Sequence, residues 1–146
     1  MRRCEHVRML RIVGVIGLAQ LVFNVLGLKK GYAEGISPDV PGFAVRTPDE
    51  VRRRHWLEGT ALSAPTVMLI VQTGAVLLLL TRRRPPVAAA RTLGALGAIM
   101  SMGYPVERIW RESLVDPDPK VTPLTVGGFI LALKLAILGW SAGRDR

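Results

Sequence analysis

The sequence contains one cysteine, Cys4, in 146 residues. One cysteine cannot form a disulfide within the chain, and it leaves no second thiol for a redox pair. Membrane oxidoreductases that exchange electrons between a thiol pair and a quinone are therefore disfavoured. The chain has two histidines, and zinc sites use three or four protein ligands. We expect no metal site, no cofactor and no catalytic residue.

Acidic residues are also few, with 11 Asp and Glu against 20 Lys and Arg, and none of them lies deep in an apolar stretch. Four stretches carry no charge other than Arg91 in the third and Lys134 in the fourth: 12–28, 59–81, 85–106 and 121–143. A helix needs about 20 mostly apolar residues to cross a hydrocarbon core of about 30 Å. The sequence therefore predicts an integral membrane protein.

The expected fold is all-α: one domain over residues 1–146, an integral membrane bundle of four transmembrane helices in two helical hairpins. The predicted spans are residues 10–28, 59–81, 87–106 and 123–141, with outer loops at 29–58 and 107–122. Arginines before the first span are also typical of a signal peptide. However, the apolar run exceeds the usual 7 to 15 residues and no A-x-A-like site follows, so we expect a retained helix.

Two Thr-Pro pairs are typical of helix starts. In Thr47-Pro48-Asp49-Glu50, Thr47 is the expected N-cap, Pro48 the first helical residue and Glu50 the acid three residues after the cap. A short interfacial helix should begin there and continue into the second span, with Pro65 as a kink. Thr122 repeats the signal before the fourth span.

The charges predict which side of the membrane each loop occupies. Ten basic and two acidic residues lie on the side of the termini, against nine of each on the other side, and Arg82 to Arg84 share one tight turn. By the positive-inside rule we expect a multi-pass protein of the cell membrane with both termini in the cytoplasm. Anionic lipids would be attracted to this basic inner face, and no nucleic-acid partner is expected. Frequent Arg, Ala, Gly, Val and Leu is typical of a bacterial protein.

Lys134 is the one charge near the middle of the fourth span, eleven residues after Pro123 and so about 16 Å along the helix. A charge at a helix centre costs roughly 2.5 to 3.5 kcal/mol on insertion scales. Its side chain could extend to the inner headgroups, or it could serve a functional site. The sharper hypothesis joins it in a small hydrophilic pocket to three amides at comparable depth: Gln20, Asn24 and Gln72. The alternative role of these amides is to join helices by hydrogen bonds.

Small residues four apart predict close helix packing, either within one chain or in a homodimer: Gly94 with Ala98, Gly97 with Ser101, and Gly128 with Ala132 and Ala136. At the outer interface, His55 and Glu58 lie three residues apart, which suits one helical face. One His and one carboxylate are too few ligands for zinc. We expect a solvated helix start anchored by Trp56 there.

Three function classes remain. The expected function is a structural or interaction component of a membrane assembly, because packing faces and a charged rim are sufficient for it. The first alternative is a small transporter or channel-like protein that uses the polar groups around Lys134. The second is a membrane enzyme acting on a lipid or quinone, for which His55, Glu58 and Glu107 are the available groups.

Overall fold

The computed structural model describes residues 2–34, 47–60 and 62–142, except the side chains of seven of them: 2, 3, 48, 51, 52, 55 and 58. Within these residues the chain is all-helical and contains no strand, which confirms the expected all-α class. The helices are α1 (Arg2–Glu34), α2 (Pro48–Glu58), α3 (Thr66–Thr81), α4 (Val87–Val106), α5 (Arg108–Val115) and α6 (Thr122–Ser141). Parts of the loop at 29–58 and of the basic carboxyl terminus lie outside the described residues.

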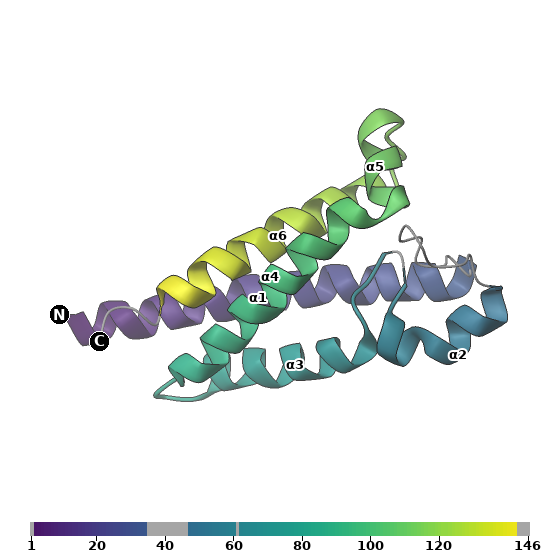
Figure 1. Ribbon diagram of the computed structural model, residues 1–146. Helices are drawn as coiled ribbons and strands as arrows, with labels where there is room; N and C mark the ends of the chain where they lie inside the picture. The colour runs from purple at the N-terminus through teal and green to yellow at the C-terminus, as the bar shows by residue number, and fades with distance from the viewer. Residues whose placement is uncertain (1, 35–46, 61, 143–146) are drawn as a thin grey trace.

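The long helices run between two ends of the molecule (Figure 1). The start of α1, the turn joining α3 to α4 and the last turn of α6 lie together at what we call the terminal end. The end of α1, together with α2 and α5, lies at the opposite end, which we call the loop end. Adjacent long helices therefore alternate in direction, as the predicted pair of hairpins requires.

Helix α2 forms as its sequence predicts. The Thr47 backbone N–H donates to Glu50 Oε2 at 3.1 Å, and the Glu50 N–H donates to Thr47 Oγ1 at 3.4 Å. These reciprocal bonds satisfy backbone donors that the first helical turn leaves without partners.

The junction between α2 and α3 differs from the predicted continuous helix with a kink at Pro65. Gly59 adopts a φ of 72°, a left-handed conformation that ends α2, and the chain stays irregular until α3 begins at Thr66. Thr60 and Ser63 exchange backbone hydrogen bonds in a tight turn, and Pro65 precedes the first residue of α3. The predicted span at 59–81 is therefore a 16-residue helix preceded by a buried turn.

This turn is held by the small-residue face of α1. A Cβ at Gly27 would collide with the Leu62 carbonyl, and a Cβ at Gly31 would lie 2.6 Å from Thr60 Oγ1. Larger side chains at these two glycines would displace the turn. The break in the second predicted span is thus fixed by a distant part of the sequence.

Helices α4 and α6 form the most extensive helix pair, and small residues let them approach closely. A Cβ at Gly139 would lie 2.5 Å from the Ala90 carbonyl oxygen, and one at Gly97 would lie 2.6 Å from the Ala132 carbonyl oxygen. The predicted packing role of small residues on both helices is confirmed for this contact within one chain.

Helix α5 is attached to the first turn of α6 by polar contacts. Ser113 Oγ lies 3.0 Å from Thr125 Oγ1, and Thr122 Oγ1 donates to the Ser113 carbonyl at 3.4 Å. Thr122 is therefore not the helix cap that its sequence predicts. Val121 occupies that position, and Pro123 lies in the first turn as expected.

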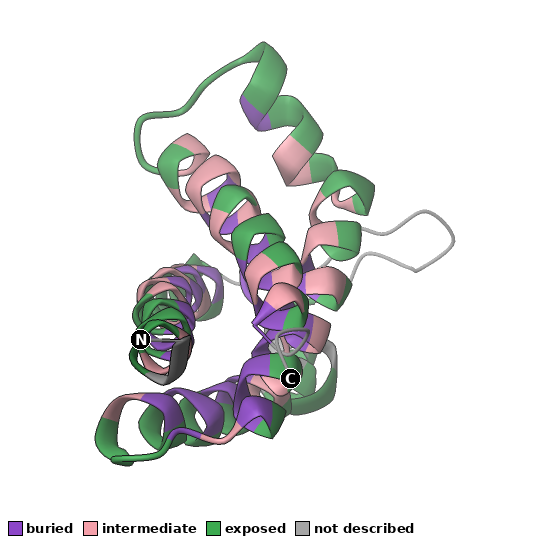
Figure 2. Cartoon of the chain, turned by 90° about the vertical axis from the view of Figure 1, so that its left-hand side faces the viewer, coloured by how far each residue is buried: buried purple, intermediate pink, exposed green. Residues whose placement is uncertain are grey.

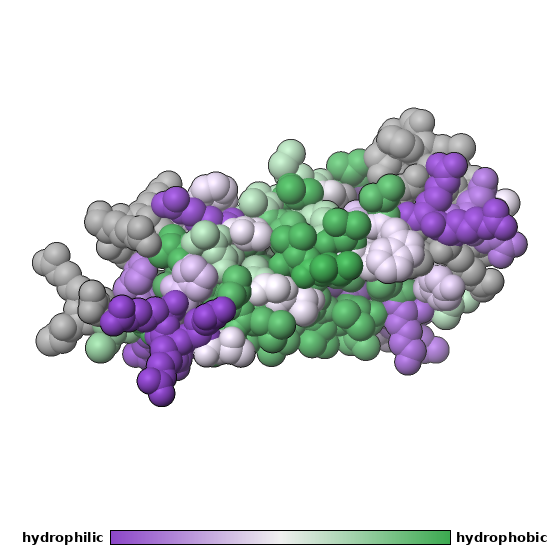
Figure 3. All heavy atoms as spheres, turned by 90° about the horizontal axis from the view of Figure 1, so that it is seen from below, coloured by the Kyte–Doolittle hydropathy of each residue, from purple (hydrophilic) through white to green (hydrophobic). Residues whose placement is uncertain are grey.

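The surface between the two ends is apolar. Buried residues face the interior between the helices and exposed residues face outward (Figure 2). On the face drawn in Figure 3, hydrophobic side chains cover the middle and hydrophilic ones gather at the two ends. Two helices, α1 from Cys4 and α6, are long and apolar enough to cross a membrane, and α3 is a shorter apolar helix. Two of the four predicted spans thus meet this criterion.

Candidate functional site

Helix α1 carries a polar face into the interior of the bundle. Gly17, Gln20, Asn24, Gly27 and Gly31 recur at steps of three and four, and all of them are buried. This spacing places them on one side of the helix, while side chains such as Val15, Leu18 and Val22 are exposed on the other. This part of α1 therefore buries its polar face and exposes an apolar one.

Gln72 joins α3 to this face. Its Nε2 donates to the Gly17 carbonyl at 3.0 Å, and its side chain has no exposed surface. Its Oε1 has no hydrogen-bond partner among the described atoms. This hydrogen bond joins α3 to α1, which is the alternative role expected for the amides.

Gln20 and Asn24 both direct their amide nitrogens at the sulfur of Met100 on α4. The distances to Met100 Sδ are 3.8 Å from Gln20 Nε2 and 3.5 Å from Asn24 Nδ2. A thioether is a weak acceptor, so neither amide is strongly satisfied by this contact. Asn24 Oδ1 accepts a 3.4 Å bond from the Ala64 N–H, whereas Gln20 Oε1 is buried without a partner. The interior thus retains unused hydrogen-bonding capacity beside Met100.

A cavity of about 150 Å³ lies next to these groups at the loop end. It is formed between α1, the turn after Gly59, α3 and α4. Its polar lining residues are Asn24, Thr60, Ser63, Tyr104 and Glu107, and its apolar ones are Ala64, Pro65, Met68, Ile99 and Met100, with Gly103. Thr60 Oγ1 is buried and has no hydrogen-bond partner among the described residues.

The ring of Tyr104 reaches from α4 toward α1 and α6. Its hydroxyl interacts with the Gln20 side chain and lies so close to Gly128 that a Cβ there would collide with it. The ring packs edge-on against Phe129 with centroids 6.2 Å apart, and Phe129 also packs against Trp110 at 5.5 Å. Tyr104 is therefore fixed as one wall of the cavity.

Lys134 lies away from this site. Its side chain is exposed, whereas the side chains of Gln20, Asn24 and Gln72 are buried. It shares the outward face of α6 with Ile130 and Ile137. Gly128, Ala132, Leu135 and Gly139 form the buried face of the same helix. The structure therefore brings the three amides into the interior and separates the lysine from them.

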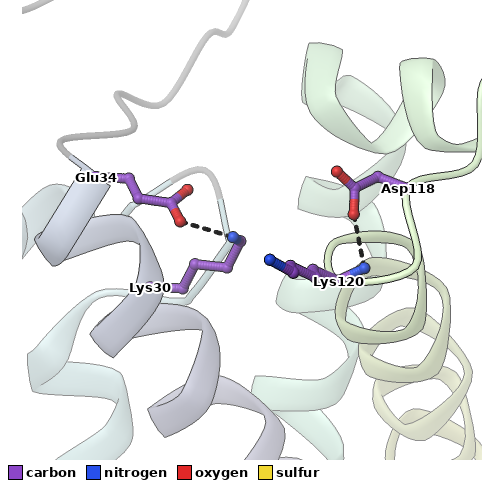
Figure 4. A network of polar contacts seen from close by, with 4 residues as sticks. All are labelled: Lys30, Glu34, Asp118 and Lys120. Atoms are coloured by element: carbon purple, nitrogen blue, oxygen red, sulfur yellow. Dashed lines mark hydrogen bonds and ion pairs between the residues drawn. The ribbon is translucent and has the colours of Figure 1, made fainter.

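His55 and Glu58 belong to α2, and their side chains lie outside the described part of the structure. Within the described residues, no three His, Cys, Asp or Glu side chains are grouped as metal ligands would be. Polar contacts at the loop end are local (Figure 4). Lys30 Nζ lies 2.7 Å from Glu34 Oε1, and Asp118 Oδ1 accepts from the Lys120 N–H at 2.6 Å. These pairs stabilise the end of α1 and the loop before α6.

Sequence reasoning did not include Thr60, Ser63 and Met100 among the site residues. Thr60 and Ser63 fall in a segment expected to be helical, and Met100 has no polar signature. The break at Gly59 was the available signal, since glycine adopts positive φ readily.

No protein-family model, curated protein or solved structure matches the chain. The fold and the site geometry are therefore the basis for function.

Proposed function

We propose that the chain is a four-span membrane protein that acts as an interaction component of a membrane assembly. Support for membrane residence comes from the inverted distribution of polarity. Amides are buried, while every long helix exposes large apolar side chains along its outer face: Ile12, Val15, Leu18 and Val22 on α1, Ile70 and Leu77 on α3, Ile99 and Met102 on α4, and Ile130 and Ile137 on α6. Monomeric soluble proteins rarely expose contiguous apolar patches of this extent.

The four-span arrangement follows from packing. Helices α3 and α4 pack between and beside α1 and α6, the two helices that meet the length and composition criterion. A bilayer that surrounds α1 and α6 would therefore also surround their neighbours. The terminal end carries Arg82, Arg83 and Arg84, all exposed, and the positive-inside rule places that end in the cytoplasm.

The observation that carries the interaction role is the exposed position of Lys134. It lies seven residues before the end of α6, about 10 Å along the helix, on an exposed face that it shares with Ile130 and Ile137. Among the described residues no carboxylate forms an ion pair with it. An ammonium group directed at hydrocarbon is costly, and intramembrane charges usually pair with another group.

We infer that the counter-charge comes from another protein and not from this chain or the inner headgroups. No Asp or Glu of this chain falls within the four proposed spans, so a second copy docked side by side offers no carboxylate at the depth of Lys134. A partner helix that carries Asp or Glu near its centre would satisfy the charge and cover the isoleucines beside it. The proposed assembly is therefore a hetero-oligomer joined through the outward face of α6.

The test is a charge-swap experiment in native membranes, followed by purification in mild detergent and native mass spectrometry. We expect a stoichiometric partner with an intramembrane carboxylate to remain with wild type and with Lys134→Arg, and to be lost with Lys134→Leu. Lys134→Glu should also lose it, and changing the partner's carboxylate to Lys should restore it. If Lys134→Leu leaves the composition unchanged and raises the thermal stability, the lysine is merely tolerated and the interaction proposal is overturned.

A further inference from the structure

The cavity at the loop end is lined by two polar residues whose hydrogen-bonding capacity is not fully used, which suits a ligand better than simple packing. Thr60, whose buried hydroxyl has no hydrogen-bond partner among the described residues, lines it together with Asn24, whose amide nitrogen contacts the weak acceptor Met100 Sδ. A buried polar group without a partner costs about 1 to 3 kcal/mol. A molecule that supplies both donors and acceptors here would recover that free energy.

The lining restricts the chemistry of such a molecule. Thr60, Ser63 and Tyr104 supply hydroxyls, Asn24 supplies an amide, and Glu107 is the only residue with a charge at neutral pH that lines the cavity. With a carboxylate and no Lys, Arg or His in the lining, an anionic head group is disfavoured. Hydroxyl groups both donate and accept hydrogen bonds, so a neutral head group with more than one hydroxyl matches the lining.

The walls also provide a place for an apolar tail. Met68 of α3 and Ile99 of α4 line the same cavity, and Ile99 is 58% exposed on the outer surface of the bundle. Gly103, also exposed, adds no side chain to the rim. If a head group occupied the cavity, its alkyl chain would therefore emerge between α3 and α4 onto the apolar outer surface of the bundle.

We propose that this cavity binds the head group of a neutral hydroxyl-bearing amphiphile, of the chemical class of a monoacylglycerol. The volume of about 150 Å³ suits a head of glycerol size. The inference rests on the membrane residence proposed above and is independent of a partner at Lys134.

The experiment uses the full chain in phosphatidylcholine nanodiscs and a monoacylglycerol with a photoreactive group near the ester. Labelling should map to peptides containing Met68 or Ile99, and unlabelled monoacylglycerol should abolish it. A fatty acid, an alkylammonium salt and free glycerol at the same concentration should leave it within twofold. Equal competition by any alkyl compound would reduce the site to annular lipid, and competition by glycerol alone would assign a free polyol; either result overturns the proposal.

Two variants separate cavity binding from general effects on folding. Gly103→Leu should fill the cavity and lower labelling at least tenfold, because Gly103 lines the cavity and a Cβ there meets no atom within 4 Å. Gly74→Leu is the matched control, since Gly74 is equally free of contacts on α3 and lines none of the cavity. Thr60→Val should lower labelling severalfold without lowering the unfolding transition of the ligand-free protein, because the buried hydroxyl has no hydrogen bond to lose among the described residues. Unaltered labelling in Gly103→Leu would refute the cavity assignment, whereas failure of wild type to enter nanodiscs would refute membrane residence instead.

Discussion

At the scale of single residues, glycine determines how closely the helices approach. Gly97 faces backbone atoms of α6, with the Ala132 carbonyl oxygen and the Ala136 nitrogen 2.6 and 2.7 Å from the place of a Cβ. Backbone atoms cannot move aside as the end of a flexible side chain can. The α4–α6 distance is therefore set by the absence of a side chain at this position.

Gly97→Ala should destabilise the protein by about 1 to 3 kcal/mol, the range for overpacking of a well-packed interior. The measurement is reversible unfolding by a denaturing detergent, followed by circular dichroism. Gly103→Ala on the same helix is the control, because its Cβ would meet nothing within 4 Å. It should be neutral or slightly stabilising, since alanine is the better helix former. Equal losses in the two variants would contradict the role assigned to Gly97.

The orientation of Lys134 shows what residue-level reasoning captures and what it misses. Its depth in the membrane is readable from the distance to Pro123. Its direction depends on which face of α6 contacts α4. The steps between Gly128, Ala132 and Gly139 indicate that face, and Lys134 lies off it. The hypothesis that grouped the lysine with the amides considered depth alone. In the structure, the amides are buried and the lysine lies on the exposed face of α6.

At the scale of elements, helix starts were more predictable than breaks. Helix α4 coincides with the predicted 87–106, and α6 begins one residue before the predicted 123. Helix α1 is longer than its predicted span of 10–28, because charged residues at both ends extend the helix without being apolar. Gly59 was the one local signal for the irregular segment before α3, and the packing of that segment was not readable because it depends on contacts with Gly27 and Gly31 that are distant in sequence.

The capping box of α2 allows a test confined to one element. Thr47→Ala removes the acceptor for the Glu50 N–H, and loss of such a cap typically costs about 1 kcal/mol. We expect amide hydrogen exchange in α2 to become roughly fivefold faster, a factor that corresponds to that free energy. Exchange in α6 should not change. As a control, Thr81→Ala removes a bond within α3, from Thr81 Oγ1 to the Leu77 carbonyl, and should leave α2 unaffected.

At the scale of the whole molecule, the proposed orientation predicts that the two ends differ in their accessibility from outside the cell. The lone native thiol is the exposed Cys4 at the terminal end, so a Cys4→Ser background allows single reporter cysteines. Arg83→Cys should react with a membrane-impermeant maleimide only after the cells are lysed. Arg53→Cys on α2 should react in intact cells. Labelling of both positions, or of neither, in intact cells would contradict the proposed orientation.

The overall architecture was accessible from the sequence because it depends on the order of apolar and charged segments. The two ends, the alternation of the long helices and the all-α class follow from that order. The cavity was not accessible, because Asn24, Thr60 and Tyr104 come from three separate parts of the chain and meet only through the packing of α1 against α3 and α4.

Under the proposed membrane residence, the lengths of α1 and α3 have a consequence for the kind of bilayer that suits this protein. The charge-free part of α1 covers 17 residues and α3 has 16. At 1.5 Å per residue, each provides an apolar helical segment about 25 Å long. A typical hydrocarbon layer is about 30 Å thick, and a short hydrophobic segment is accommodated by local thinning at a cost of fractions of a kcal/mol per ångström. Such hydrophobic mismatch would concentrate the protein in the thinnest membrane regions available to it, together with any other short-spanning protein sorted there.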